Sequence, residues 1–266
     1  MRTARQVAIV TGGSRGIGKA IAVCMAKSGL DIVINYRNNE RAAIETVEQI
    51  KSMGQRAIML EGDITSPDTA STLVRKTLEQ FDAVDILVNN VGEFFFGRLA
   101  EMNYEDWQAV IQSNLSSVFY MCSAVLPSMR QQKRGQIINI GLSPTHIVRG
   151  APHISAYAIA KTGVQILTRS LAIEEATHNI RVNCVSPGLI DNGYLPSEER
   201  TWMEQRVPLG RLGTPEDVAN AVAFLISDTA TYISGANLAV AGGWDWEDRP
   251  TNYDSNMHGW FREKCN

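Results

Sequence analysis

The sequence is poor in the residue types that cross-link small proteins or bind metal ions. It has four cysteines and four histidines among 266 residues. The cysteines, Cys24, Cys122, Cys184 and Cys265, lie far apart, and no two form a Cys-x-x-Cys pair. This spacing indicates neither a zinc site nor a disulfide framework. We therefore expect no bound metal and reduced thiols, as in a cytoplasmic protein.

The sequence also lacks long hydrophobic runs and an excess of positive charge. No apolar run approaches the ~18 residues that a membrane span needs, and the N-terminal run, residues 7–10, is too short for a signal-peptide core. The 25 Lys and Arg residues face 28 Asp and Glu residues, for a formal net charge of −3. We expect no membrane span and no nucleic-acid partner.

Short apolar runs recur along the chain, and amphipathic stretches lie between them. Such runs are typical of strands that are buried on both faces of a parallel sheet. Residues 41–53 have helical spacing, and helix-start signals stand at Ser66-Pro67 and Thr214-Pro215. The alternation predicts an α/β fold, a Rossmann-type doubly wound parallel sheet of about seven strands with helices on both faces. The expected strands are residues 7–10, 32–34, 57–60, 86–88, 137–140, 180–185 and 238–240.

The length suits one large α/β domain, and no linker, repeat or low-complexity stretch divides it. We assign residues 1–243 to a single Rossmann-fold catalytic domain. Residues 244–266 follow the last expected strand and fit no sheet element, yet they hold Trp244, Trp246 and Trp260, three of the five tryptophans. Because large aromatic side chains bury much area, we expect this C-terminal extension to pack on its own subunit or on a neighbour.

A glycine-rich turn follows the first expected strand and precedes a helix. Glycines in such a turn let the backbone approach a pyrophosphate, and the helix N-terminus supplies free N–H groups. A glycine turn alone is a weak signal, but its position between strand and helix strengthens it. The nucleotide-binding residues predicted here are Gly12, Ser14, Arg15, Gly16, Ile17 and Gly18.

The end of the second expected strand lacks the acidic residue that binds the adenosine ribose in many dinucleotide-binding proteins. Asp31 stands at the start of that strand, which is the wrong end, and Arg37 follows its end. Arg37 and Arg15 would suit a 2′-phosphate, which predicts NADP(H) as the cofactor. The alternative is that both arginines are solvated surface residues.

Three side chains are candidates for catalysis. Tyr157 and Lys161 stand four residues apart and share one face of an expected helix. A free tyrosine has a pKa of about 10, and a nearby ammonium and a cationic cofactor would bring it closer to neutrality. Asn114 lies in the apolar stripe of another helix, where an amide needs hydrogen-bond partners. Taken alone, the Tyr–Lys pair is most often a surface pair, and Asn114 a structural amide.

In combination, these residues resemble the short-chain dehydrogenase/reductase family over nearly the whole chain. Each match is weak, but their order and spacing make the set specific. Within the family, residues 114–119 and 208–217 are most similar to 3-oxoacyl-[acyl-carrier-protein] reductases. The matching segments are residues 11–18, Gly62-Asp63-Ile64, Asn89-Asn90-Val91-Gly92, Asn114, residues 137–143, Tyr157-x3-Lys161 and Ser186-Pro187-Gly188.

The resemblance implies a role for each candidate. Tyr157 would be the general acid in reduction and the base in oxidation. Lys161 would bind the nicotinamide ribose and lower the pKa of the tyrosine, and Ser143 would hold the substrate oxygen. Asn114 would position a water that links Lys161 to solvent. Beyond the glycine turn and Arg37, the implied cofactor contacts are Asp63 and Ile64 at the adenine, Asn90 along the adenosine ribose, Gly188 and Ile190 beside the nicotinamide, and Tyr157 and Lys161.

Three positions depart from the family pattern. Val91 replaces the usual alanine, and Asn192 stands where a threonine is frequent. The substrate-binding serine of the family usually lies thirteen residues before the tyrosine, a position that Pro144 occupies here. A short insertion in the loop of residues 144–154 would make Ser143 the donor, since loops tolerate insertions.

These observations predict an NADPH-dependent oxidoreductase that reduces a carbonyl to a secondary alcohol. The leading hypothesis is a 3-oxoacyl-[acyl-carrier-protein] reductase of fatty acid biosynthesis, and the resemblance also implies a homotetramer. An aromatic, pterin, sugar or other small ring substrate is the alternative, because Phe94, Phe95 and Phe96 follow the fourth strand at the ligand-binding edge. These rings would equally suit core or subunit contacts. A non-catalytic dinucleotide-binding regulatory protein is the alternative from another class.

Overall fold

The computed structural model describes residues 5–143, 150–193 and 195–244. Within them, seven strands form one parallel sheet in the order β3-β2-β1-β4-β5-β6-β7. This confirms the predicted Rossmann-type doubly wound sheet. The strands are β1 Val7–Val10, β2 Asp31–Tyr36, β3 Ala57–Glu61, β4 Ile86–Asn89, β5 Gly135–Ile140, β6 Ile180–Pro187 and β7 Asn237–Val240.

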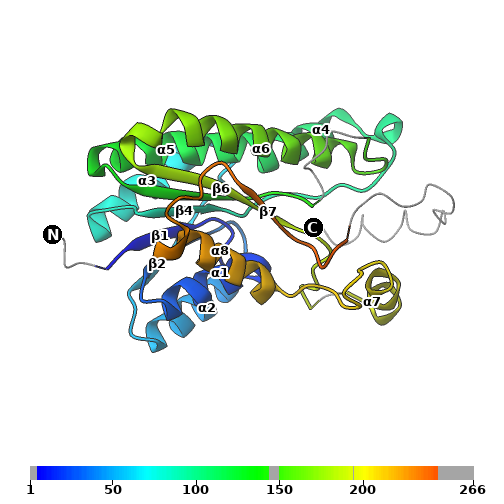
Figure 1. The fold of residues 1–266 in the computed structure, drawn as a ribbon, viewed down its shortest axis with the longest axis horizontal. Helices are drawn as coiled ribbons and strands as arrows, with labels where there is room; N and C mark the ends of the chain where they lie inside the picture. The colour runs from blue at the N-terminus through cyan, green and yellow to red at the C-terminus, as the bar shows by residue number, and fades with distance from the viewer. Residues whose placement is uncertain (1–4, 144–149, 194, 245–266) are drawn as a thin grey trace.

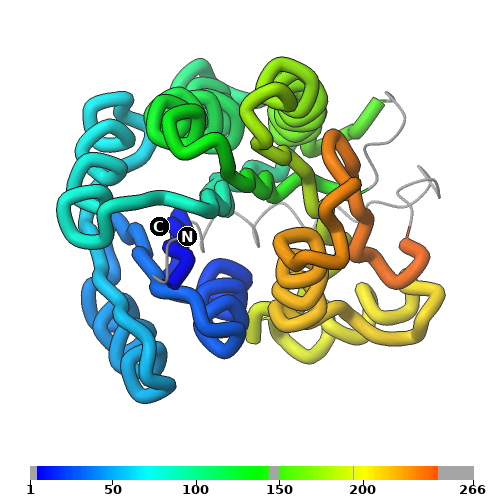
Figure 2. Tube along the Cα trace, turned by 60° about the vertical axis from the view of Figure 1, so that its left-hand side comes forward, coloured from blue at the N-terminus to red at the C-terminus, as the bar shows by residue number. Residues whose placement is uncertain are grey.

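Helices cover both faces of the sheet. Figures 1 and 2 show α3, α5 and α6 on one side and α1, α2 and α8 on the other. The main helices are α1 Gly16–Lys27, α2 Glu40–Ser52, α3 Pro67–Phe81, α4 Tyr104–Ile111, α5 Ser117–Gln132, α6 Ser155–Glu174, α7 Ser197–Glu204 and α8 Pro215–Ile226. Short turns are η1 Leu99–Glu101, η2 Gln112–Ser116, η3 Ala176–His178 and η4 Asp228–Ala230.

The strands are largely apolar because each face of the sheet packs against a helix layer. In β1, Ala8 and Val10 belong to the core cluster under α1, α2 and α8, whereas Val7 and Ile9 belong to the cluster under α3, α5 and α6. All four side chains are buried. A continuous apolar run is therefore what this sheet requires, in place of alternating polar and apolar residues.

The helix-start signals have different outcomes. At the start of α8, Thr214 and Asp217 form a capping box, in which each side chain accepts a hydrogen bond from the backbone N–H of the other residue. At the start of α3, Pro67 occupies the first turn as expected, but Ser66 makes no side-chain capping bond to any described residue. Ser66 is therefore the N-cap residue of α3, as the helix-start signal indicates, but its side chain adds no capping bond.

The helix expected around Asn114 is present from Tyr104 to Gln132, and its middle turn departs from regular α-helical geometry. Residues Gln112–Ser116 form one π-helical turn, η2, between α4 and α5. The combined stretch Tyr104–Gln132 is long and apolar enough to cross a membrane by length and composition. Half of its most apolar window is buried inside the fold, where α5 packs on α3, β4 and β5, as expected of a core helix.

The order of the strands reverses between β1 and β4. The chain moves outward from β1 to β2 and β3, and then crosses back to β4 on the other side of β1. In such sheets the carboxyl ends of the two central strands leave a crevice in which ligands bind. The glycine turn follows β1 and the Asn89-Asn90-Val91-Gly92 segment follows β4, so both reach this edge.

Most of the predicted C-terminal extension, residues 245–266, lies outside the described residues, as do Pro144 and the rest of residues 144–149. The packing of the extension on a subunit therefore stays a prediction.

Candidate active site

The glycine turn forms a tight cradle at the end of β1. Gly12 and Gly16 have φ of +62° and +52°, in a backbone region that residues other than glycine rarely adopt. A Cβ on Gly12 would stand 2.9 Å from Val91 Cγ2, and one on Gly18 would overlap the carbonyl oxygen of Gly12. The side chains of Asn90 and Val91 and the backbone of the turn itself thus pack closely on these glycines. Larger residues at these positions would fill the cradle.

The cradle opens onto the N-terminus of α1. Arg15 is the N-cap, and its side chain makes no capping bond within the described residues. The first turn of α1 contains no acidic residue either. The free N–H groups and the helix dipole therefore remain available for an anion such as a pyrophosphate. Ser14 is buried in the turn, and Ile17 packs partly against the core.

Asn90 fastens the glycine turn to β4. Its side-chain Nδ2 donates to the carbonyl of Thr11 at 3.1 Å, and its backbone N–H donates to Thr11 Oγ1 at 2.9 Å. Thr11 Oγ1 in turn donates to the carbonyl of Val88. Sequence reasoning expected Asn90 along the adenosine ribose and did not single out Thr11. The structure shows that both residues hold the turn in shape, and the ribose contact stays a prediction.

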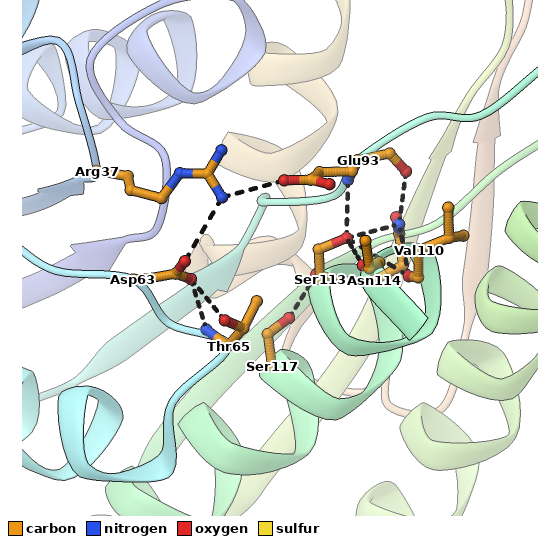
Figure 3. A network of polar contacts seen from close by, with 9 residues as sticks. Arg37, Asp63, Thr65, Glu93, Val110, Ser113, Asn114 and Ser117 are labelled. Carbon is orange, nitrogen blue, oxygen red and sulfur yellow. Dashed lines mark hydrogen bonds and ion pairs between the residues drawn. The ribbon is translucent and has the colours of Figure 1, made fainter. Parts of the chain in front are cut away.

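Arg37 lies at the end of β2 as expected, but two carboxylates already hold it. Its Nη1 is 3.0 Å from Glu93 Oε1 and 3.5 Å from Asp63 Oδ2 (Figure 3). Glu93 comes from the loop after β4 and Asp63 from the loop after β3. Neither belongs to β2, the strand at whose end many dinucleotide-binding proteins have an acidic residue. Sequence reasoning missed Glu93. An acid directly after Asn89-Asn90-Val91-Gly92, at the same sheet edge, was the available signal.

The other predicted adenine contact, Ile64, is buried in the core cluster under α3 and α5. Asp31, at the wrong end of β2, has a structural role, because its buried carboxylate pairs with Arg56 and accepts the Arg56 backbone N–H. The contacts of Asp63 and Ile64 with adenine stay predictions.

Tyr157 and Lys161 share one face of α6 at the carboxyl edge of the sheet. Lys161 Nζ lies 5.5 Å from the centre of the Tyr157 ring and donates to the carbonyl of Ile140, the last residue of β5, at 2.8 Å. Burial lowers the pKa of Lys161 to about 8 and raises the pKa of Tyr157 to about 12. Desolvation is the cause of the raised tyrosine pKa in the protein chain itself, and the lowering expected from Lys161 together with a cationic cofactor stays a prediction.

A polar ladder inside the core fixes the position of α6. Asn89 Nδ2 donates to Asn139 Oδ1, and Asn139 Nδ2 donates to Thr168 Oγ1, both at 2.9 Å. These residues lie on β4, β5 and α6, and all three are buried. Because a buried amide without a partner costs stability, the ladder disfavours any shift of α6 along the sheet. Sequence reasoning did not find Asn139 or Thr168.

Ser143 follows β5 at the same edge. Its backbone N–H donates to the carbonyl of Pro187, the last residue of β6, at 3.0 Å, and the residue is buried. Gly141, just before it, packs so closely on Cys184 and Ser186 that a Cβ there would meet both side chains. Ser143 thus lies between the ends of β5 and β6, and the role of its hydroxyl stays a prediction.

Asn114 is fully buried in the π turn η2. Its Nδ2 donates to the carbonyl of Glu93 at 2.7 Å and to that of Val110 at 3.0 Å. Its Oδ1 has no hydrogen-bond partner within the described residues and lies so close to Gly92 that a Cβ there would overlap it. The amide therefore links the loop after β4 to the helix, and its Oδ1 keeps a buried acceptor free. The predicted water relay stays a prediction.

The aromatic loop after β4 reaches the tyrosine. The ring of Phe94 stands edge-on to that of Tyr157, with centroids 5.1 Å apart and an interplanar angle of 82°. Phe96 stacks on His153 at 5.3 Å. Phe94, Phe95 and Phe96 are all partly buried, so none belongs to the fully buried core.

The loop after β6 completes the edge. Gly188 donates its N–H to the carbonyl of Val240, and a Cβ there would meet Ala241 and approach the ring of Trp244. Ile190 pairs with Gly213 in a parallel bridge. Further along, Asn192 Oδ1 is 3.3 Å from where a Cβ on Gly16 would stand, so this loop lies next to the glycine turn.

The same arrangement occurs in proteins of known family. A crystal structure described as a short-chain alcohol dehydrogenase from Sinorhizobium meliloti 1021 is similar with a TM-score of 0.85 and 30% identity, over 91% of this chain and 96% of that one. A family profile described as Enoyl-(Acyl carrier protein) reductase matches residues 12–245. This chain is a short-chain dehydrogenase/reductase. The fold and the predicted family are thereby confirmed.

Curated relatives of this short-chain dehydrogenase/reductase have several substrates. A 3-oxoacyl-[acyl-carrier-protein] reductase of Synechocystis is 40% identical over 90% of this chain and 96% of its own. An L-rhamnose 1-dehydrogenase (NAD(P)(+)) of Sphingomonas is 38% identical over 88% and 94%. A 3beta-hydroxysteroid dehydrogenase 1 of Eggerthella lenta is 37% identical over 88% and 92%. The chain is therefore an oxidoreductase acting on CH–OH or C=O groups with a nicotinamide dinucleotide, and the substrate differs among its relatives.

The residues of this short-chain dehydrogenase/reductase fit such a cofactor. The glycine cradle and the uncapped N-terminus of α1 suit a pyrophosphate, and the exposed guanidinium of Arg37 suits the adenosine end. Among the described residues, no group of three or more His, Cys, Asp and Glu side chains is placed to hold a metal ion.

Proposed function

We propose that this chain reduces a ketone carbonyl to a secondary alcohol with NADPH. The position of Tyr157 carries the proposal. Its ring contacts Phe94 in the loop after β4, while Asn90, four residues earlier in the chain, holds the glycine turn. An acid–base side chain and a nucleotide cradle thus flank one short loop. This is the arrangement that proton transfer beside a bound dinucleotide requires.

The chain's own residues would divide the work as follows. A bound nicotinamide dinucleotide supplies the hydride. Tyr157, which is protonated at neutral pH and whose pKa burial raises to about 12, donates a proton to the carbonyl oxygen. Ser143 donates a hydrogen bond to the same oxygen and orients it. Lys161, fixed by the carbonyl of Ile140, holds the ribose of the nicotinamide half and keeps a positive charge near the tyrosine.

The first candidate substrate is a 3-oxoacyl thioester carried on acyl carrier protein. Support comes from the reductases of Synechocystis and Staphylococcus epidermidis, which are 40% and 38% identical to this chain and cover it almost fully. The preference for NADPH over NADH is inferred from Arg37, directly after β2, and Arg15, at the start of α1, because a charge-assisted bond to a 2′-phosphate contributes about 1.5–3 kcal/mol.

A ring-shaped substrate is the second candidate. Phe94 stands edge-on to Tyr157, so an aromatic ring lies beside the proton donor. Aromatic faces bind flat rings through offset stacking and large apolar contact areas. The relatives named for a sugar and for a steroid show that the family profile alone does not decide between the two.

A carbonyl panel tests the proposal. Purified protein is mixed with NADPH or NADH and with an acetoacetyl thioester on acyl carrier protein, an aldose, a 3-ketosteroid or an aromatic ketone. We expect the thioester with NADPH to have the highest kcat/KM. Tyr157→Phe should lose about 10²–10⁴-fold in kcat while still binding NADPH, because only the proton donor is removed. If the protein binds NADPH but does not oxidise it in the presence of any carbonyl of the panel, the result would instead support the non-catalytic hypothesis.

A further inference from the structure

The guanidinium of Arg37 is already ion-paired through one of its nitrogens. Its Nη1 lies between Glu93 Oε1 and Asp63 Oδ2, at 3.0 and 3.5 Å, and both ion pairs are about half exposed. The hydrogen bond that Arg37 donates to Glu93 is the main cause of the raised pKa of Arg37. The end of β2 has no acidic residue of its own, but two carboxylates from other loops lie next to it. The positive charge of Arg37 is therefore partly balanced by Glu93 and Asp63.

The two carboxylates differ in how they are held. Asp63 Oδ1 accepts hydrogen bonds from the backbone N–H and the hydroxyl of Thr65, at 3.0 and 2.8 Å. Asp63 is thus engaged with its own loop and offers Arg37 only its other oxygen. For Glu93, Arg37 is the one side-chain partner of the carboxylate within the described residues. Glu93 is therefore the carboxylate with which a ligand would have to compete for Arg37.

The backbone of Glu93 is fixed from both sides. Its N–H donates to Ser113 Oγ at 3.0 Å, and its carbonyl accepts from Asn114 Nδ2 at 2.7 Å. Figure 3 shows the peptide clamped to η2 while the side chain extends toward Arg37. A side chain on an anchored peptide keeps its carboxylate within reach of Arg37.

We propose that Glu93 is a specificity-determining residue for the cofactor, and that its carboxylate competes with a 2′-phosphate for Arg37. A 2′-phosphate on Arg37 would share the guanidinium with Glu93 or displace it from Nη1, and in either case would lie near the negative charge of Glu93, which weakens binding. A ribose with a free 2′-hydroxyl leaves the ion pair intact, and that hydroxyl can donate to a carboxylate. The inference rests on the proposed cofactor site. It predicts that the ratio of the affinity for NADPH to the affinity for NADH is smaller than Arg15 and Arg37 alone would produce.

Calorimetric titration with two nucleotides that lack nicotinamide tests the inference. The probes are adenosine 2′,5′-bisphosphate and 5′-AMP, titrated into the full-length protein at low ionic strength, where exposed charges are least screened. Glu93→Gln should tighten binding of the bisphosphate about two- to fivefold, the range of an exposed ion pair. It should not tighten binding of 5′-AMP, whose 2′-hydroxyl can donate to the carboxylate that the substitution removes. Glu61→Gln is the matched control, because Glu61 ends the neighbouring strand β3 and no ion pair joins it to Arg37 in the described chain.

The variants separate the outcomes. Equal tightening of both probes by Glu93→Gln, or an equal effect of Glu61→Gln, would show a general charge effect and overturn the inference. No change at all in Glu93→Gln, in a variant whose thermal unfolding matches the wild type, would overturn it as well. No carbonyl substrate is present in these titrations, so a lack of turnover in the panel would defeat the proposed reaction without touching this result. Failure of the wild type to bind either probe would overturn both.

Discussion

Burial acts in opposite directions on the two ionisable side chains of α6. It raises the pKa of Tyr157 to about 12 and lowers the pKa of Lys161 to about 8, because desolvation disfavours whichever form is charged. At neutral pH the tyrosine is therefore protonated and the lysine is still charged. Those are the protonation states that reduction of a carbonyl needs, since the hydroxyl must give up a proton.

The pH dependence of reduction should follow Lys161. Its ammonium is present below about pH 8 and is lost as pH rises through that value, whereas Tyr157 stays protonated to about pH 12. We expect kcat/KM for reduction to fall above about pH 8, since this parameter reports groups of the free enzyme. Lys161→Arg keeps its charge at high pH and should move the fall to higher pH in whatever activity it retains. A wild-type profile that stays level through pH 8 to 10 would contradict the assignment.

Ser143→Ala tests the predicted substrate donor. Removal of one preorganised hydrogen-bond donor to a reacting oxygen typically lowers kcat by ~10²–10³. We expect such a loss with NADPH affinity nearly unchanged, measured by steady-state kinetics and nucleotide titration. Ser155→Ala is the control, because Ser155 Oγ donates to the carbonyl of Ala151 at the start of α6. If the two variants have similar kcat values, Ser143 does not hold the substrate.

At the scale of elements, the helix ends differ in how they are stabilised. The capping box at the start of α8 satisfies backbone donors that the helix leaves open. The π turn η2 has another effect. It inserts an extra residue where Asn114 turns inward, so that the amide reaches the loop after β4. Such π turns are frequent at functional sites.

Thr214 and Ser66, the N-cap residues of α8 and α3, make a matched pair for a stability measurement. Thr214→Ala should lower the free energy of unfolding by about 1 kcal/mol, because the capping bond to Asp217 is lost. Ser66→Ala should change it by only a few tenths, because Ser66 makes no side-chain capping bond within the residues that the structure describes. Urea unfolding followed by circular dichroism measures both. Equal losses would show that the Thr214 cap adds nothing specific.

At the scale of the molecule, one helix face is unusually apolar for a surface. Ile159, Ile166 and Ile173 recur every seven residues on α6 and are 51%, 64% and 79% exposed. Residues seven apart lie nearly on one line along a helix. Exposed apolar surface of this kind marks association sites. We propose that this face packs against a second copy of the chain within the expected homotetramer.

Ile166→Glu tests the assembly. A buried, unpaired carboxylate in an apolar contact is strongly destabilising, so the variant should dissociate into smaller species with its fold retained. Light scattering after size exclusion measures the mass, and circular dichroism checks the fold. Ile44→Glu on α2, where Ile44 is 40% exposed on the opposite layer, is the control and should leave the mass unchanged. A monomeric wild type, or an unchanged mass for Ile166→Glu, would contradict the proposal.

The sequence by itself determined the architecture, because its signals are local and periodic. Runs buried on both faces located all seven strands within a few residues, and Pro67 and the Thr214 signal located two helix starts. The glycine turn and the Tyr157–Lys161 pair were found for the same reason, since each depends on spacing within one or two adjacent elements. Their order along the chain then indicated the family.

Only the tertiary structure decided which side chains from distant segments meet. Glu93 and Asp63 reach Arg37 from loops 56 and 26 residues away in the chain, and no local pattern at β2 announces them. The contact of Phe94 with Tyr157 and the clamping of Glu93 by Asn114 likewise depend on how the loop after β4 packs. The upward shift of the Tyr157 pKa also depends on the tertiary structure. Its cause is desolvation, which is set by all the atoms packed around the hydroxyl and not by its neighbours in sequence.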